Sequence, residues 1–195
     1  MFDESEGGVI GRWQRLVLLL AILIVAMVGI SHVVPFAVKP AQVSLFSQDR
    51  AMQHVAVIAA RPHPVGSPAN ASVRAYLVNQ IRLLGFAPQV QTAVVVDPSR
   101  NLAGKVHNVL VKIPGSSPGK ALLLVAHYDS VHTGPGAADD GASIAAMLEM
   151  LRLMRSQKPY RNDVIFLFTD GEEVGLLGAQ GFIGQHPWAR EVGLA

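Results

Sequence analysis

Two apolar runs without alternation constrain the fold of this chain more than any other feature. The runs extend from about Ala121 to Ala126 and from about Asp163 to Phe168. Because neither shows the apolar–polar alternation of a strand with one wet face, both are expected to be central strands covered on both faces. Between them, Gly141 to Ser156 has the apolar spacing of a strong helix. Strand, helix and strand at this spacing predict a parallel crossover unit in an α/β domain.

The stretch before this unit predicts two helices and two strands. Helical spacing runs from Asp49 to Ala60, and Ser47 or Asp49 is placed to cap that helix. A second helix is expected from Ser67-Pro68 to Leu84, because serine caps helices well and proline fits a first turn. Gly85 is expected to end it. The strand-like runs cover about 87–96 and 108–113.

The segment near the N-terminus predicts a transmembrane helix. Leu16 to Ile30 contains no charged residue, and a weakly polar stretch extends it to Val38. This is about the ~20 residues that cross a bilayer as a helix. Arg12 and Arg15 precede it, so the positive-inside bias places the N-terminus in the cytoplasm.

This topology divides the chain into a cytoplasmic tail (1–15), a transmembrane helix (16–38), a linker (39–48) and a domain (49–195) outside the cytoplasm, in a periplasmic, extracellular or organelle-lumen compartment. The alternative is a cleaved signal peptide. A long tail containing three acids and the lack of a clear A-x-A site favour the uncleaved anchor.

Composition narrows the chemistry that the domain can carry. The chain has no cysteine, so any metal must be held by histidine, aspartate or glutamate. The formal net charge is +2, and the lysines and arginines are scattered, which argues against a nucleic-acid partner. The oligomeric state is not indicated.

Three clusters of polar residues stand at the ends of the crossover elements. His127 and Asp129 follow the first apolar run, and Asp139-Asp140 precede the helix. Asp170 and the adjacent Glu172-Glu173 follow the second run. Because ligands of open α/β sheets bind at the carboxyl ends of parallel strands, these clusters are expected to converge.

Each cluster alone also fits an ordinary strand-end turn, helix cap or helix N-terminus. Together they form a concentration of acids with no lysine or arginine inside any of them, for which a bound cation is the natural partner. One histidine with several carboxylates suits zinc or a similar divalent ion. The number of carboxylates favours a pair of metals that share a bridging carboxylate, about 3.5–4 Å apart.

These pieces carry a family resemblance. The segments "RPHPVGSPAN", "HNVLVKIPG", "LLLVAHYDSV", "GAADDGAS" and "FTDGEEVGLLGAQGF" resemble the di-zinc aminopeptidases of metallopeptidase family twenty-eight, which includes glutamate carboxypeptidase relatives. The resemblance covers about 46–182, and "PHPVGSPAN" is similar to its membrane-bound branch. We therefore expect a three-layer αβα sandwich with a central mixed, mainly parallel sheet, incomplete here, after one transmembrane helix.

The resemblance also implies residue roles. His127 would bind the first zinc, Asp139 would bridge two zinc ions and Glu173 would bind the second. Glu172 would be the general base, and Asp129 would hydrogen-bond the free nitrogen of His127 and fix its tautomer. Asp140 would be structural, in an Asp-Asp peptide that is usually cis in this family, whereas Asp170 and His63 are expected to order a turn and a loop.

The implied function is a membrane-anchored, zinc-dependent exopeptidase, an aminopeptidase that acts on peptide substrates. The resemblance requires two further ligands beyond Ala195, so we expect an N-terminal fragment of a longer protein that is inactive alone. Alternatives are a non-catalytic binding or receptor-type domain and a glutaminyl-cyclase-like acyl transfer. The related di-zinc carboxypeptidase and deacylase family ranks lower, because His132 and Gly141 stand where it usually has proline and lysine.

Overall fold

The computed structural model describes residues 11–33, 46–156 and 159–195, which belong to two compact units, Met1–Lys39 and Pro40–Ala195. In the first unit, helix α1 (Arg12–Val33) contains a 21-residue span, Trp13–Val33, long and apolar enough to cross a membrane. None of its most apolar window is buried against protein. The part of the expected transmembrane segment after Val33 lies outside the described residues.

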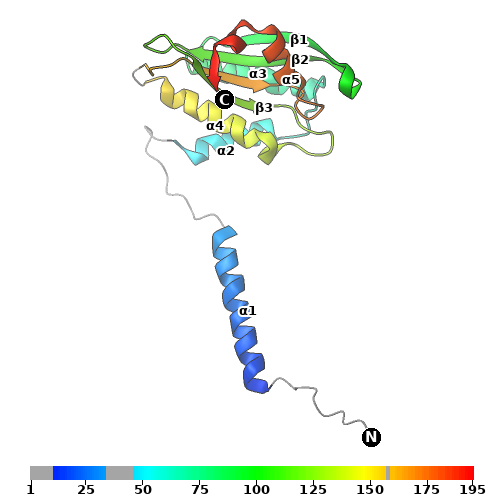
Figure 1. Ribbon diagram of the computed structural model, residues 1–195, viewed down its shortest axis with the longest axis vertical. Coiled ribbons are helices and arrows are strands. Elements are labelled where there is room, and N and C mark those ends of the chain that lie inside the picture. Colours follow the sequence, from blue (N-terminus) through cyan, green and yellow to red (C-terminus); the bar gives the residue numbers. More distant parts are fainter. Residues whose placement is uncertain (1–10, 34–45, 157–158) are drawn as a thin grey trace. The chain divides into compact units, whose positions relative to one another are not determined.

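The second unit is built on one mixed sheet of five strands (Figure 1). The strands are β1 (Gln89–Asp97), β2 (Leu102–Ile113), β3 (Ala121–His127), β4 (Val164–Thr169) and β5 (Val192–Leu194), in the order β1-β2-β4-β3-β5. The β1–β2 and β2–β4 pairs are antiparallel, and the β3–β4 and β3–β5 pairs are parallel. Among these strands, therefore, β2 alone runs against the common direction.

Helices cover both faces of the sheet, as expected for three layers. Helices α2 (Gln48–Ile58), α3 (Pro68–Leu83) and α4 (Ala142–Met154) enclose the main apolar core on one face. Helix α5 (Leu177–Gln185) covers the other face, where its Phe182 packs with Leu110 and Leu167 (Figure 1). Short helical turns η1 (Pro98–Arg100), η2 (Ala137–Gly141) and η3 (Pro187–Glu191) complete the unit.

The two apolar runs behave differently in the sheet. All six residues of β4 are buried, with Phe166 and Phe168 in the main core and Leu167 on the α5 side, as predicted for a central strand. For the run from Ala121 to Ala126, the prediction that both faces are covered was wrong for one of the two faces. Val125 is 49% exposed, because α5 lies over β1 and β2 rather than over this end of β3.

Local sequence signals set the helix ends. The Ser47 side chain accepts a hydrogen bond from the Arg50 N–H, and that of Ser67 accepts one from the Asn70 N–H. Each serine thereby satisfies a backbone donor that a first helical turn leaves unpaired. Gly85 follows α3 with φ +86°, a conformation that glycine adopts without strain.

Strand β1 forms an edge of the sheet and carries few features that protect such an edge. Val90, Val94 and Val96 are exposed, and the strand has no charged residue before Asp97. The Gln185 amide donates a hydrogen bond to the Val94 carbonyl, which occupies one acceptor. The other face of β1 packs Ala93 and Val95 against Leu177 of α5.

A buried carboxylate joins α2 to α4. Glu149 is 1% exposed and accepts hydrogen bonds from the Ser47 N–H and from the Arg50 and Arg152 guanidinium groups. Burial alone would raise the pKa of Glu149, but the bonds from Arg152, Arg50 and Ser47 lower it to about 2. Charge thus holds the start of α2 to α4, and the apolar contact of Val55 with Ala145 holds its second half.

We expect Glu149→Gln to lower the free energy of unfolding at pH 7 by about 3 kcal/mol, because the buried carboxylate accepts charge-assisted hydrogen bonds that an amide cannot replace. Since folding lowers the pKa of Glu149, its contribution is fully present above pH 4.5 and is lost as the pH falls towards 2. Urea unfolding at pH 7 and pH 3 measures both effects.

Glu191→Gln is the matched control, because Glu191 pairs with Lys112 at a partly exposed site. That substitution should change the free energy of unfolding by less than about 1 kcal/mol. Equal changes in the free energy of unfolding for Glu149→Gln and Glu191→Gln would show that the buried carboxylate of Glu149 has no special role in stability.

Candidate metal centre

The parallel pairing of β3 with β4 brings two of the predicted clusters together. His127, the last residue of β3, is paired with Thr169, the last residue of β4. Asp129 therefore follows one strand, and Asp170 to Glu173 follow the other, at the same edge of the sheet. The convergence expected from the sequence is present in the structure.

The imidazole of His127 is buried and held at both nitrogens. Nδ1 lies 3.0 Å from the backbone oxygen of Asp129 and 3.6 Å from its carboxylate. A carbonyl oxygen can only accept, so Nδ1 carries the proton of this hydrogen bond. Nε2 faces outward, 3.1 Å from an oxygen of Asp139 and 3.8 Å from one of Glu172. Nε2 is thus the nitrogen available to a ligand.

Asp129 accepts the expected hydrogen bond from Nδ1 of His127, but with a different atom than predicted. The backbone oxygen of Asp129, rather than the carboxylate, is the nearer partner. The carboxylate is 1% exposed and accepts hydrogen bonds from the Glu172 N–H at 3.0 Å and the Glu173 N–H at 3.2 Å. Asp129 therefore joins the end of β3 to the loop that follows β4.

The acids around His127 favour a positive charge at this place. Burial alone would lower the pKa of His127, but hydrogen bonds with Asp129 and Asp139 outweigh it and raise the pKa to about 9. Glu173 shows the complementary effect, since burial raises its pKa and the neighbouring His127 opposes that rise. The cluster thus stabilises a cation among its carboxylates.

Asp139 and Asp140 lie in η2, just before α4. The peptide bond between them is cis, as the resemblance implied. The Asp139 side chain is 83% exposed and reaches Nε2 of His127. Asp140 instead accepts a hydrogen bond from the His127 N–H at 3.4 Å, a contact with backbone that agrees with the structural role expected of it.

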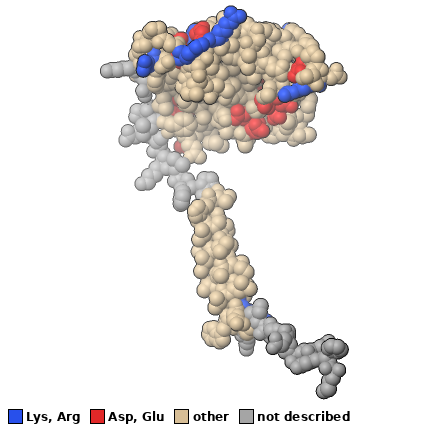
Figure 2. Space-filling view, viewed as in Figure 1, with Lys and Arg blue, Asp and Glu red and all other residues tan. Residues whose placement is uncertain are grey.

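Three predicted ligands come together as a group. One ligand atom from each of His127, Asp139 and Glu173 lies within 4.8 Å of the other two. Glu172 stands beside them with its side chain 37% exposed. Figure 2 shows acidic side chains, in red, at several places on the visible face of the domain, with the densest group at its lower right. An imidazole at the end of β3 and two carboxylates, one in η2 and one in the loop after β4, are a donor set that zinc accepts.

Asp170 is turned away from this group. It is 1% exposed, and its carboxylate accepts hydrogen bonds from the Asn70 amide and from the His107 N–H. Burial raises the pKa of Asp170, while the bonds from His107 and Asn70 oppose that rise. The expectation that Asp170 orders the strand end agrees with these contacts, whereas its partner Asn70 was missed.

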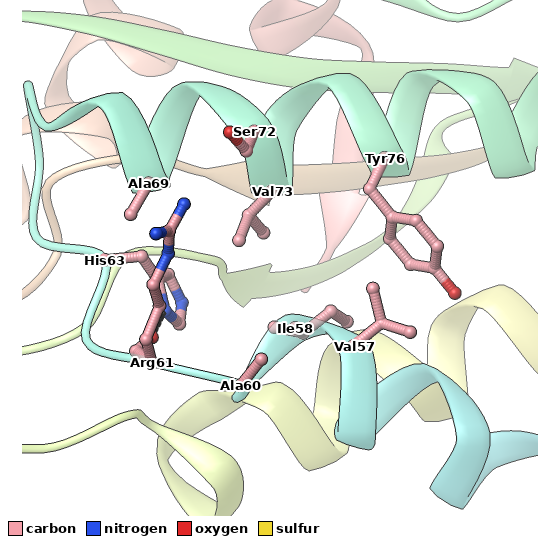
Figure 3. A pocket seen from close by; sticks show the side chains of 9 residues that line it. All are labelled: Val57, Ile58, Ala60, Arg61, His63, Ala69, Ser72, Val73 and Tyr76. Atoms are coloured by element: carbon pink, nitrogen blue, oxygen red, sulfur yellow. Dashed lines mark hydrogen bonds between the residues drawn. The ribbon is translucent and has the colours of Figure 1, made fainter.

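His63 orders its loop, as expected. It is 2% exposed, its N–H donates to the hydroxyl of Ser130, and its Nδ1 lies 2.9 Å from the Arg61 oxygen. The loop also borders a cavity of about 300 Å³ between α2 and α3. Figure 3 shows Val57 and Ile58 of α2 facing Val73 and Tyr76 of α3 across it. Its lining contains no acid, so it does not share the chemistry of the cluster.

Solved structures share this fold. A glutaminyl cyclase from Porphyromonas gingivalis is 26% identical, with a TM-score of 0.63 over 72% of this chain and 54% of that one. A zinc-dependent exopeptidase from Parabacteroides distasonis is 22% identical, with a TM-score of 0.62 over 76% of this chain and 57% of that one. The fold is therefore the α/β fold of these glutaminyl cyclases and zinc-dependent exopeptidases.

Sequence comparison places the chain more narrowly. Residues 108–195 match the model of Peptidase family M28, and the chain belongs to that family. It is 39% identical over 145 residues to a vacuolar membrane protease of Candida dubliniensis and 37% identical over 155 residues to endoplasmic reticulum metallopeptidase 1 of Mus musculus. These matches cover 70% and 71% of this chain but only 16% and 17% of those relatives.

Asp139→Asn should lower the pKa of His127 from about 9 towards its ordinary 6.5, because the hydrogen bond to an ionised carboxylate favours the imidazolium. The stabilisation that this bond gives to the folded state is present below pH 6.5 and is lost as the pH rises through 9. An NMR titration of the His127 ring, with chelator present, measures the pKa.

Asp163→Asn serves as control, since Asp163 contacts Lys112 and the Gly115 N–H instead. That substitution should leave the pKa of His127 unchanged. The same pKa in Asp139→Asn and in the unmodified chain would show that Asp139 does not interact with the ring.

Proposed function

We propose that this chain is part of a membrane-anchored, zinc-dependent exopeptidase, an aminopeptidase whose catalytic domain lies outside the cytoplasm. The observation that carries the proposal is the grouping of His127, Asp139 and Glu173 with Glu172 beside them. Membership of the M28 family and the membrane-protease relatives support a peptidase. Peptide substrates and the aminopeptidase specificity are part of the proposal.

The resemblance to the family implies which residues would hold the metals, and the grouping of their ligand atoms supports it. Nε2 of His127 would bind one zinc, Glu173 a second, and the exposed carboxylate of Asp139 would bridge the two. When bound, zinc supplies Lewis-acid chemistry, since it polarises a carbonyl group and makes water more acidic. The orientation of the ring suits this role, because the backbone oxygen of Asp129 accepts the Nδ1 proton and Nε2 faces the carboxylates of Asp139 and Glu172.

Glu172 would act as the general base. Its side chain is 37% exposed, and its Oε2 lies 3.8 Å from Nε2 of His127. From there it can take the proton of the attacking water and deliver it to the amine that leaves. Its backbone is fixed by the buried Asp129 carboxylate, so the base is held on a defined loop.

A second candidate function is glutaminyl cyclisation, because a glutaminyl cyclase is among the structures that share this fold. Profiling of peptides with free N-termini distinguishes the two. Release of the N-terminal residue supports the exopeptidase, and formation of a cyclised N-terminal glutamine supports the cyclase. The third alternative, a binding domain, predicts neither product and no sensitivity to chelators.

In the full-length protein, Glu172→Gln should retain zinc and lower kcat by about 10²- to 10⁴-fold, because the amide cannot accept the proton. Metal analysis and peptidase assays on the same preparation measure both quantities. Glu191→Gln, at the site that contacts Lys112, should leave kcat unchanged. Turnover of Glu172→Gln at the unmodified rate would refute the role of Glu172.

The topology can be tested with single cysteines, because the chain has none. Ser99→Cys in η1 should react with a membrane-impermeant maleimide from outside the cytoplasm, whereas Ser5→Cys should react only after the membrane is opened. The label at residue 5 should stay with the protein in the membrane pellet. Its loss from the mature chain would show a cleaved signal peptide.

A further inference from the structure

We propose that Asn70 is a positioning residue that fixes the loop from Asp170 to Glu173 by holding Asp170. That this loop carries the base and a metal ligand rests on the proposed function, but the contact itself does not. Asn70 lies in the first turn of α3, in the segment "RPHPVGSPAN", which supplies neither the proposed base nor any of the proposed metal ligands.

The Asn70–Asp170 contact is buried, and both carboxylate oxygens of Asp170 accept a hydrogen bond. Both residues are 1% exposed, and Nδ2 of Asn70 donates to Oδ1 of Asp170 at 2.9 Å. The other carboxylate oxygen accepts the His107 N–H at 3.0 Å. Without Asn70, one oxygen of a buried carboxylate would lose its donor, which is among the more unfavourable defects of a protein interior.

The loop is held at a second point immediately beyond. Asp129 accepts the N–H groups of both Glu172 and Glu173. Gly171 lies between these two anchors. Its φ of +70° is a backbone conformation that residues with a side chain rarely adopt. Asp170 and Asp129 thus fix the loop from opposite ends, and a shift of either would move both glutamates.

The first turn of α3 is itself attached to the end of β3. Ser67 caps the helix by accepting the Asn70 N–H at 3.0 Å. The loop before it is tied through His63, whose N–H donates to the Ser130 hydroxyl, one residue after Asp129. The segment therefore connects the strand end that carries His127 with the loop that carries the two glutamates, and Asn70 completes the connection.

The test uses substitutions at both ends of the contact in the full-length protein. Asn70→Ala removes the donor. Asn70→Asp disrupts the pair by placing two carboxylates together, whereas its combination with Asp170→Asn restores an amide-to-carboxylate hydrogen bond and leaves an acceptor for the His107 N–H. Asn79, an exposed asparagine on the same helix, provides the matched controls Asn79→Ala and Asn79→Asp.

Two measurements are made on each variant. Hydrogen exchange of the Glu172 and Glu173 amides, with zinc removed by chelator, reports the loop directly. Competition with a zinc indicator reports the affinity of the site. We expect exchange to be at least about tenfold faster and zinc affinity about 10- to 100-fold weaker in Asn70→Ala. The double exchange of Asn70 and Asp170 should return both quantities to within about threefold of the unmodified protein.

Exchange and affinity within twofold of the unmodified protein in Asn70→Ala would overturn the proposal, as would a double variant that restores neither. If Asn70→Ala does not fold, the double variant decides. If the unmodified protein binds no zinc, the proposed function fails while the exchange measurement still decides the role of Asn70.

Discussion

The parallel pairing of β3 with β4 is the interaction on which the rest of this structure depends. It runs without a break from Leu122 and Val164 to His127 and Thr169, so both strands end at the same level. A slip of β3 by one residue would turn His127 to the opposite face of the sheet, away from Asp139 and Glu172. The crossover through α4 also places Asp139 and Asp140 beside those strand ends, which makes the site a product of the register.

Buried carboxylates perform much of the assembly around that edge. Asp129, Glu149 and Asp170 are each 1% exposed, and each accepts backbone N–H groups from a segment distant in sequence. No buried side-chain nitrogen or oxygen lacks a partner within the described part of the chain. A fully paired polar network specifies one arrangement, because every alternative leaves a buried charge without its donors.

Local patterns were sufficient to predict the elements whose signals are strong. The helix caps at Ser47 and Ser67, the crossover helix and the ends of β3 and β4 were predicted within two residues. Helix α5 and the first half of β2 were missed for physical reasons. Helix α5 contains three glycines and has weak periodicity, and the first half of β2 includes Gly104 and Lys105, so tertiary pairing rather than propensity sets both.

The grouping of His127, Asp139 and Glu173 was expected, since acids at neighbouring strand ends converge by topology. The contact between Asn70 and Asp170 was not, because it joins residues 100 positions apart and an asparagine in a first helical turn has an ordinary local explanation.

Strand β1 lies at the edge of the sheet, with β2 as its only neighbour among the described strands. The unpaired backbone groups along the outer side of β1, of which Gln185 occupies the Val94 carbonyl, are a template to which an extended chain can add as a further strand.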